Sequence, residues 1–306
     1  MIILDGPTLV FGGAYSNRQA LEALLDVAAR RGVPPRRIVS TGDLIAYGAD
    51  PAACVDLARA AGILAIQGNC EANLAAGAPD CGCGFAPASS CDALSAAWYA
   101  HAQAGLDEPR RAWLAGLPQR LDLSLAGLRL TVLHGAPNEI ARFVFASAPE
   151  RVKAAELALL DDGGAACDGV IVGHSGLPFT RTVGGRLWHN SGALGMPAND
   201  GTPRGWFSIL TPLGAGDIAI EHVALDYDHA AAAAAMRAAA LPEVYARALE
   251  TGLWPDCDVL PAAERKAGGR PLTAGAVRFT GGRGGAEWPG RPAAPPPDPA
   301  RVRDPD

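Results

Sequence analysis

Apolar runs alternate with stretches of helical spacing through the first half of the chain. The run TLVFGG at residues 8–13 precedes a pattern over 17–31 in which leucines recur at helical spacing. In the same way, RRIVSTGD at 36–43 precedes a helical stretch at 50–62. Because strands and helices follow one another in turn, this half predicts a sheet that is flanked by helices.

After residue 120 the pattern becomes mostly that of strands. Residues 121–135 alternate between apolar and polar positions, like a hairpin whose turn lies near Ala126-Gly127. Further strands are predicted at the runs GVIVGHS, RTVGGRLWHNSG, GWFSILTP and DIAIEHVALD. Helices are predicted over 149–163 and over 229–250, where Pro242 interrupts the second one.

From about residue 264 the composition turns to Gly, Pro and Arg. Such a segment has little apolar surface to bury, so we expect residues 264–306 to form a disordered tail. The preceding residues 1–263 are then expected to form a single domain. A cysteine-bearing insertion is predicted within it, at about residues 72–100.

Composition and charge exclude several classes of function. The 306 residues carry a formal net charge of −6, which gives no reason to expect binding to nucleic acid or to an anionic membrane surface. No run of about 18 apolar residues predicts a transmembrane helix. The N-terminus lacks the basic region of a signal peptide, so the seven cysteines are expected to be reduced thiols in the cytoplasm.

Polar side chains that can bind a metal stand at the ends of four predicted strands. They are Asp43, Asn69, His134 and His174, and each lies beside a glycine. Strand ends that meet at one edge of a sheet are where open α/β folds place ligands. One such Asp or His is usually structural, but four in succession form a plausible shell for one transition metal ion, Mn, Fe or Zn.

The motifs around these residues resemble those of the calcineurin-like metallophosphoesterase superfamily. GDLIAYGADP, GNCE, HGAP, GHSGLPF and HNSGALGMPANDGTPR follow one another in the family's order, and the resemblance covers roughly residues 8–212. It is closest to the small bacterial phosphoesterase branch. The resemblance implies an α/β fold, a β-sandwich with helices on both outer sides and a metal site at one edge. In the family, two metals activate a hydroxide that attacks phosphorus.

The sequence departs from the family at the ligands that only the first metal uses. The family's first turn reads D-x-H-G-N, but here Gly13 and Tyr15 stand at the Asp and His positions. The later G-H-x-H motif is GHSG, so Gly176 replaces its second His. The four ligands of the second metal, Asp43, Asn69, His134 and His174, are all present, which predicts a degenerate, mononuclear site.

The resemblance also suggests roles for residues around that metal. Asn17 is expected to meet the substrate phosphate together with Asn190 and Arg204, and either Ser16 or Asn17 can cap the first helix. Tyr15 is expected to fill the vacated space or to donate a hydrogen bond to a substrate oxygen. His189 matches a position close to the family's metal site, so it can enter the pocket.

The cysteines leave several interpretations open. Cys70 can be an inert small residue, a weak acid that takes part in catalysis, or a soft metal ligand. Cys81, Cys83 and Cys91 follow in the insertion, with a spacing that permits an additional zinc or iron–sulfur site. Reduced cysteines in a glycine-rich loop, or a disulfide, are the alternative.

These observations predict a metal-dependent protein that acts on a small phosphorylated substrate. The favoured hypothesis is hydrolysis of a phosphoester or phosphoanhydride at the degenerate site. The alternative is an accessory protein on the same scaffold that binds a metal or a ligand without hydrolysis. The opening turn GGAYSN matches neither the dinucleotide-binding nor the P-loop pattern, which argues against a nucleotide fold.

Overall fold

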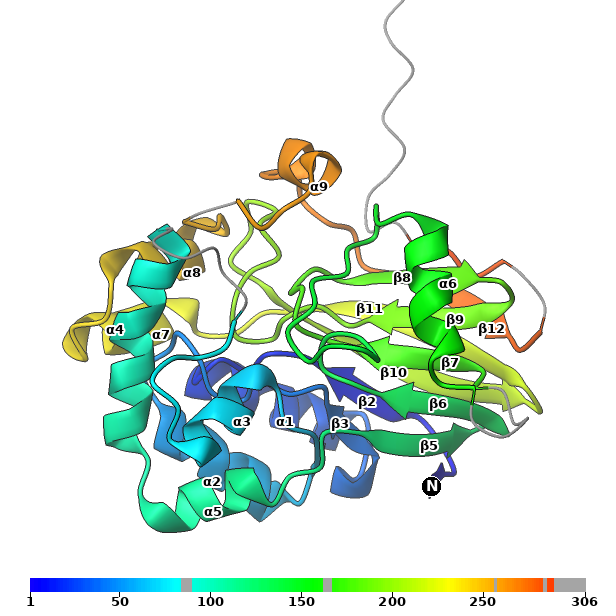
Figure 1. The fold of residues 1–306 in the computed structure, drawn as a ribbon, viewed down its shortest axis with the longest axis horizontal. Helices are drawn as coiled ribbons and strands as arrows, with labels where there is room; N and C mark the ends of the chain where they lie inside the picture. Colours follow the sequence, from blue (N-terminus) through cyan, green and yellow to red (C-terminus); the bar gives the residue numbers. More distant parts are fainter. Residues whose placement is uncertain (84–89, 162–166, 256–257, 283–284, 289–306) are drawn as a thin grey trace, which may run out of the picture.

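Two mixed β-sheets pack face to face and form the centre of the molecule (Figure 1). The structure is a computed structural model that describes residues 1–83, 90–161, 167–255, 258–282 and 285–288. The side chains of residues 90–93 lie outside this description. Within the described part of the chain, no helix is both long enough and apolar enough to cross a membrane.

Sheet A comes largely from the middle of the chain. Its six strands are, in spatial order, β1 (Ile2–Leu4), β5 (Leu121–Leu125), β6 (Leu128–Val132), β7 (Gly169–Val172), β9 (Arg186–Asn190) and β8 (Phe179–Val183). The predicted hairpin is confirmed, because β5 and β6 pair antiparallel around Ala126 and Gly127, which both have positive φ. Strands β6, β7 and β9 run parallel to one another.

Sheet B combines strands from both ends of the chain. Its six strands are, in spatial order, β12 (Gly275–Thr280), β11 (Asp217–Leu225), β10 (Gly205–Gly214), β2 (Thr8–Phe11), β3 (Ile38–Ser40) and β4 (Leu64–Ala65). Strands β2, β3 and β4 are parallel, whereas β10, β11 and β12 continue the sheet antiparallel.

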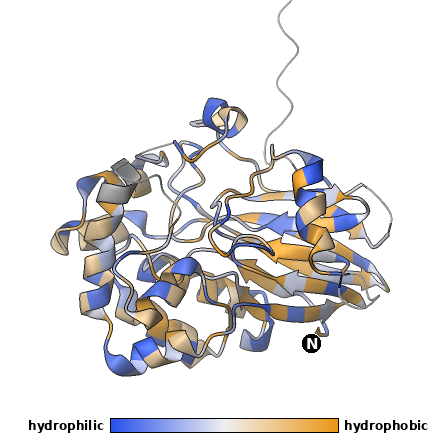
Figure 2. Cartoon of the chain, in the orientation of Figure 1, coloured by the Kyte–Doolittle hydropathy of each residue, from blue (hydrophilic) through white to orange (hydrophobic). Residues whose placement is uncertain are grey.

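The alternation of side chains along β2 shows how sheet B separates two apolar clusters. Val10 points into the cluster between the sheets, together with Val39 of β3 and Ile171 of β7. Leu9 and Phe11 point the opposite way, into the cluster that sheet B shares with the helices. Successive residues of a strand face opposite sides, so a strand buried on both faces is apolar throughout, as the orange strands of Figure 2 show.

Helices cover both outer sides of the sandwich. The apolar cluster beside sheet B includes residues of α1 (Arg18–Arg30), α2 (Pro51–Ala61), α3 (Asn69–Ala76), α4 (Ser90–Gly105), α5 (Glu108–Ala115), α7 (His229–Ala238) and α8 (Glu243–Thr251). On the other side, α6 (Glu150–Ala158) packs against sheet A, where Leu157 meets Val170 and Val172 of β7. The predicted fold class, a β-sandwich with helices on both outer sides, is confirmed.

Local sequence signals set the helix ends. Asn17 caps α1, because its side-chain oxygen accepts a hydrogen bond from the backbone N–H of Ala20 at 3.0 Å. Helix α2 begins at Pro51 and is followed by Gly62 in the left-handed conformation. Pro242 separates α7 from α8, at the interruption that the sequence predicts.

The predicted boundary at residue 264 is wrong. A short helix, α9 (Ala262–Ala267), lies across it, and β12 then pairs with β11 over Gly275–Thr280. Phe279 is fully buried in the cluster between the sheets, and Arg278 forms an ion pair with Asp217. This segment is rich in glycine, proline and arginine overall, but its short alternating run supplies enough apolar surface to complete a sheet. Residues 289–306 of the predicted tail lie outside the described residues.

Candidate metal centre and adjoining cavity

Both sheets bring candidate metal ligands to one edge of the sandwich. In sheet B, Asp43 follows β3, and Asn69 begins α3 just after β4. In sheet A, His134 follows β6 and His174 follows β7. Because β3 neighbours β4 and β6 neighbours β7, these residues, far apart in sequence, meet at the strand ends as the sequence predicts.

The Nε2 atom of His134 lies at the centre of the group. It is 3.0 Å from Oδ1 of Asn69, 3.1 Å from Nδ1 of His174 and 3.2 Å from Oδ2 of Asp43. Asp43, His134 and His174 each offer a ligand atom within 4.8 Å of the others. All four side chains therefore point at one small volume.

Hydrogen bonds behind these atoms show that they face one another as acceptors. Nδ1 of His134 lies 2.7 Å from the backbone oxygen of Thr41, which can only accept, so Nδ1 carries the proton of a neutral ring. The amide nitrogen of Asn69 donates to the backbone oxygen of Cys81 at 2.9 Å, which leaves its Oδ1 for the centre. In that neutral ring, a lone pair on Nε2 meets an amide oxygen and a carboxylate oxygen. Such a group of acceptors is repulsive unless a proton or a metal cation lies among them, and a carboxylate, an amide oxygen and two imidazoles are ligands that a transition metal ion accepts.

Burial and mutual charge shift the ionisation of the three groups. Burial opposes the ionisation of Asp43. The neighbouring His134 nevertheless lowers the pKa of Asp43, so this side chain stays a carboxylate. Burial is the largest single influence on His134 and lowers its pKa, but the charge of Asp43, the contact with that carboxylate and the hydrogen bond to Thr41 together raise the pKa of His134. Burial first, and then His134, lower the pKa of His174 to about 3, so His174 is neutral at pH 7. An ionised carboxylate and a neutral imidazole are the forms that bind metals.

The backbone of the Asp43 loop is held by a residue that the sequence analysis did not single out. Oε2 of the buried Glu71 accepts from the backbone N–H groups of Asp43 at 2.7 Å and Gly68 at 2.8 Å, and Oε1 accepts from Ile45 at 2.9 Å. Asp43 has a φ of 54°, an uncommon value for a residue with a side chain, so its conformation depends on such support. The signal was available in GNCE, where Glu71 stands at the third position of α3.

Next to the candidate metal centre, aromatic rings fill the space around Gly13, Tyr15 and Gly176. A Cβ atom on Gly13 would lie 2.6 Å from Cε1 of Tyr15, so the Tyr15 ring occupies the place of a side chain there. A Cβ atom on Gly176 would lie 3.3 Å from Cζ2 of Trp254. Aromatic rings therefore stand where the resemblance places ligands of a first metal.

Two of the predicted cysteine ligands form a bond with each other. Cys81 and Cys83 are joined in a disulfide, in contrast to the expectation of reduced thiols throughout. In this state neither sulfur is a thiolate that could bind zinc or an iron–sulfur cluster. Cys91 belongs to α4, but its side chain lies outside the described residues. Cys70 is a buried free thiol whose pKa is raised by burial and then by the Asp43 charge.

The residues predicted to meet the substrate phosphate are engaged elsewhere. The amide nitrogen of Asn17 donates to Gly195 and Tyr227, while its oxygen caps α1. Asn190 donates to the backbone oxygen of Gly173 and to Ser175, and its oxygen accepts from Gly192.

Arg204 and His189 likewise belong to other networks. Arg204 lies over the ring of Trp206 and forms hydrogen bonds with Thr202, Asp200 and the backbone oxygen of Leu272. His189 is fully buried, with Nδ1 at 2.9 Å from Oγ1 of Thr180. Neither side chain lines the cavity at the metal centre.

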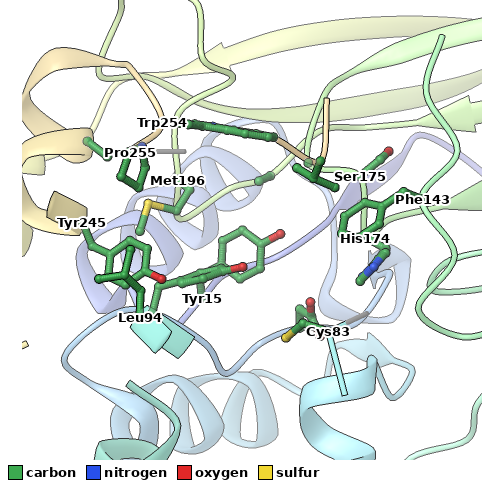
Figure 3. Close-up of a pocket in the computed structure, with 16 residues that line it drawn as sticks. Tyr15, Cys83, Leu94, Phe143, His174, Ser175, Met196, Tyr245, Trp254 and Pro255 are labelled. Carbon is green, nitrogen blue, oxygen red and sulfur yellow. The ribbon is translucent and has the colours of Figure 1, made fainter. Parts of the chain in front are cut away.

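A cavity of about 100 Å³ opens beside the candidate metal centre. Asp43 and His174 line its inner end, and most of its wall is aromatic or apolar (Figure 3). The aromatic wall consists of Tyr15, Tyr47, Phe143, Tyr245 and Trp254, and Leu94, Met196, Pro255 and Val259 are among its other apolar residues. Among the described residues that line this cavity, none is a lysine or an arginine.

The aromatic wall is the part of the site that sequence reasoning missed, except for Tyr15. Tyr245 belongs to α8 and Trp254 follows it, more than two hundred residues after Tyr15 in the chain. In sequence, single aromatic residues in helices and loops look like ordinary core residues. No local pattern marks them as neighbours of the strand-end motifs.

A protein-family model matches the same region of the chain. The model is described as the calcineurin-like phosphoesterase superfamily domain, and it matches residues 14–211. This interval contains Asp43, Asn69, His134 and His174.

Individual relatives resemble this chain over most of its length. An uncharacterized protein of Methanocaldococcus jannaschii is 26% identical over 242 residues, which cover 72% of this chain and 87% of the relative. The crystal structure of a metallophosphoesterase from Sphaerobacter thermophilus is 25% identical, with a TM-score of 0.63 over 81% of this chain and 99% of that chain. A hypothetical protein from Pyrococcus horikoshii has a TM-score of 0.67 at 15% identity, over 83% of this chain and 100% of that chain, which shows a shared fold.

Proposed function

Because the chain belongs to the calcineurin-like phosphoesterase superfamily, we propose that it hydrolyses a phosphoester or phosphoanhydride at a site that holds one transition metal ion. Asp43, Asn69, His134 and His174 would bind the ion. The observation that carries this proposal is the convergence of three candidate ligand atoms on Nε2 of His134, within 3.0–3.2 Å. Ligands of this kind suit Mn, Fe or Zn.

The arrangement around Gly13 and Gly176 supports one metal rather than two. The Tyr15 ring and the Trp254 ring stand beside these glycines, where first-metal ligands would need to be. A second ion would therefore lack both its ligands and its space.

When bound, the ion supplies Lewis acidity to the phosphoryl group and to the attacking water. The chain's own residues provide orientation and protons. Burial, and then the charge of Asp43, raise the pKa of Tyr15, so this side chain keeps its proton and can donate a hydrogen bond to a phosphoryl oxygen. The backbone of Asp43 is fixed by Glu71, which keeps its carboxylate directed at His134.

The proposal is tested by metal content and hydrolysis measured together. Protein reconstituted with Mn should contain one metal per chain outside the cysteine segment and should hydrolyse 4-nitrophenyl phosphate or bis(4-nitrophenyl) phosphate. His134→Ala should lose both the metal and the activity, because three donors compete poorly with water for the ion. His229→Ala, at the first residue of α7 and outside the cavity wall, is the matched control and should lose neither.

A non-hydrolytic role on the same scaffold is the second candidate. It is favoured by the absence of first-metal ligands and of a basic residue in the described cavity wall. The same experiment separates the two functions, because a binding protein would hold the metal through His134 and hydrolyse neither ester. Two metals in the centre, or equal metal content in His134→Ala and the parent protein, would overturn the mononuclear site itself.

A further inference from the structure

We propose that the cavity beside the metal centre binds phosphodiesters that carry one flat aromatic group, and that it discriminates against phosphate monoesters. This inference rests on the proposed function for the position of the phosphoryl group. It goes beyond that function by naming the substrate class. Three features carry it: the rings of the wall, the charge of the lining and the size of the space.

The rings of the wall offer apolar surface to a ligand. The ring centroids of Tyr15 and Tyr47 lie 5.0 Å apart, and those of Tyr47 and Tyr245 lie 5.1 Å apart, so these side chains support one another. Trp254 stands across the cavity from Tyr15 and Tyr245 (Figure 3).

The indole of Trp254 is fixed by its polar edge. Nε1 donates to the backbone oxygen of Pro197 at 2.7 Å, and the backbone N–H of Trp254 donates to Oδ1 of Asn199 at 2.9 Å. The hydrogen-bonding capacity of the indole is thereby used outside the cavity. What it presents to a ligand is a rigid apolar ring, and stacking between rings contributes about 0.5–1.5 kcal/mol beyond burial.

The charge of the cavity lining and of the metal centre suits a ligand with one negative charge. A phosphate monoester carries a charge of about −1.5 to −2 at pH 7, whereas a diester carries one negative charge. A divalent metal together with the Asp43 carboxylate has a net charge of +1, which one negative charge balances. Arginine and lysine are absent from the described lining, and Arg204 is held by Asp200 and Leu272, so nothing there neutralises a second charge.

The size of the space limits the apolar group to about one ring. The cavity measures about 100 Å³, the same order as the roughly 150 Å³ that holds benzene in an engineered apolar core. A phenyl group next to the phosphoryl position fills such a space, while a methyl group leaves most of it to water. The aromatic diester therefore gains burial that a methyl diester does not.

Binding is tested with phosphinates, which do not hydrolyse and carry one negative charge. Calorimetry on the Mn-loaded protein should show that methyl(phenyl)phosphinate, which carries one ring, binds at least tenfold more tightly than dimethylphosphinate. It should also bind more tightly than phenylphosphonate, which carries the same ring and approaches a second charge at high pH. Equal affinity for the two phosphinates, or tighter binding of the phosphonate at pH 9, would overturn the inference.

Substitutions at Trp254 test whether this part of the cavity wall causes the preference for an aromatic phosphinate. Trp254→Ala should reduce the preference for methyl(phenyl)phosphinate about fivefold or more, and Trp254→Phe should restore part of it, because phenylalanine keeps a ring without the Nε1 bond. Trp113→Ala, on α5 and outside the cavity, should leave the preference unchanged. If a Trp254→Ala protein still binds dimethylphosphinate and keeps an unchanged preference, the aromatic ring of the ligand does not lie against Trp254.

Hydrolysis distinguishes failure of this inference from failure of the proposed function. Phenyl 4-nitrophenyl phosphate and methyl 4-nitrophenyl phosphate share one leaving group. Hydrolysis of both at similar kcat/KM, with no preference among the phosphinates, contradicts the aromatic site and leaves the phosphohydrolase intact. A clear phosphinate preference without any hydrolysis supports the aromatic site and contradicts the phosphohydrolase.

Discussion

The ring of Tyr15 stands in the space that a side chain on Gly13 would need, since a Cβ atom there would lie 2.6 Å from Cε1 of the ring. The two residues are therefore coupled, and neither can be changed to a metal ligand independently of the other. Gly13 also has a φ of 36°, which adds backbone strain for any larger residue.

Gly13→Asp alone should destabilise the protein by roughly 1–3 kcal/mol, as overpacking of a filled site does. Gly13→Asp with Tyr15→His should recover part of this loss, because the smaller imidazole vacates some of the space. Urea unfolding of the two single variants and the double variant measures this coupling. Strictly additive losses would mean that the ring and the new carboxylate do not compete.

The triple variant that adds Gly176→His should bind a second metal and gain about tenfold in hydrolysis of a phosphodiester, or ~1.4 kcal/mol of barrier. Its restored groups would lie beside Asp43, which the family uses as a bridge between two metals. The new imidazole must displace the Trp254 ring, which lies within 3.3 Å of the Gly176 Cβ position, so partial occupancy is expected. Elemental analysis checks the stoichiometry, and a well-folded triple variant with one metal would refute the assignment of this turn.

Glu71→Gln should weaken metal binding although Glu71 does not face the metal. The amide can replace only one carboxylate oxygen, so at least one of the N–H groups of Asp43, Gly68 and Ile45 loses its acceptor. We expect a stability loss of about 1–3 kcal/mol and a metal affinity lower by about tenfold, measured by chelator competition. Glu22→Gln, at an exposed ion pair with Arg18, is the control and should change neither.

Reduction of the Cys81–Cys83 disulfide should expose two additional thiols per chain, counted by mass after alkylation in denaturant. It should also weaken metal binding, because the backbone oxygen of Cys81 holds the amide nitrogen of Asn69. Cys81→Ser with Cys83→Ser should reproduce the loss without reductant, while Cys167→Ser, which lies on sheet A's side, should not. Metal affinity that is insensitive to both treatments would show that Asn69 is oriented without the disulfide.

Ending the chain after Gly268 should destabilise the protein strongly, since it removes β12 and the buried Phe279. Phe279→Ala alone should cost about 3–5 kcal/mol. A chain that ends after Trp288 keeps the contacts of β12 and serves as the control. Thermal unfolding compares the three, and an unchanged midpoint after the Gly268 truncation would mean that β12 does not stabilise the sandwich.

The strand-end residues could be predicted because their signal is local. Asp43, Asn69, His134 and His174 each follow an apolar run, and parallel strands bring such positions to one edge. A helix cap near Asn17 could also be predicted from the local sequence. The side chain of Asn17 is fully used by this cap and by its hydrogen bonds to Gly195 and Tyr227.

Other features depend on partners that are remote in sequence. In β12, the alternation of Val277, Arg278 and Phe279 was outweighed by the surrounding glycines and prolines, and its partner strand β11 ends fifty residues earlier. The cavity wall had no local signal, because Tyr245 and Trp254 acquire their role only when α8 packs into the apolar cluster beside sheet B.

The family match ends at residue 211, yet Tyr245, Trp254, Pro255 and Val259 of the cavity wall come after it. The candidate ligands of the metal centre are therefore encoded in the matched length of chain, whereas the cavity wall is divided between that length and the residues that follow it. During evolution, the candidate ligands can be inherited intact while the later part of the wall is exchanged. Two proteins that share everything up to residue 211 would keep Tyr15, Tyr47 and Phe143 and differ in the rest of the aromatic wall. Grafting the residues after 211 from a relative onto this chain would exchange that part of the wall while leaving the candidate ligands of the metal centre in place.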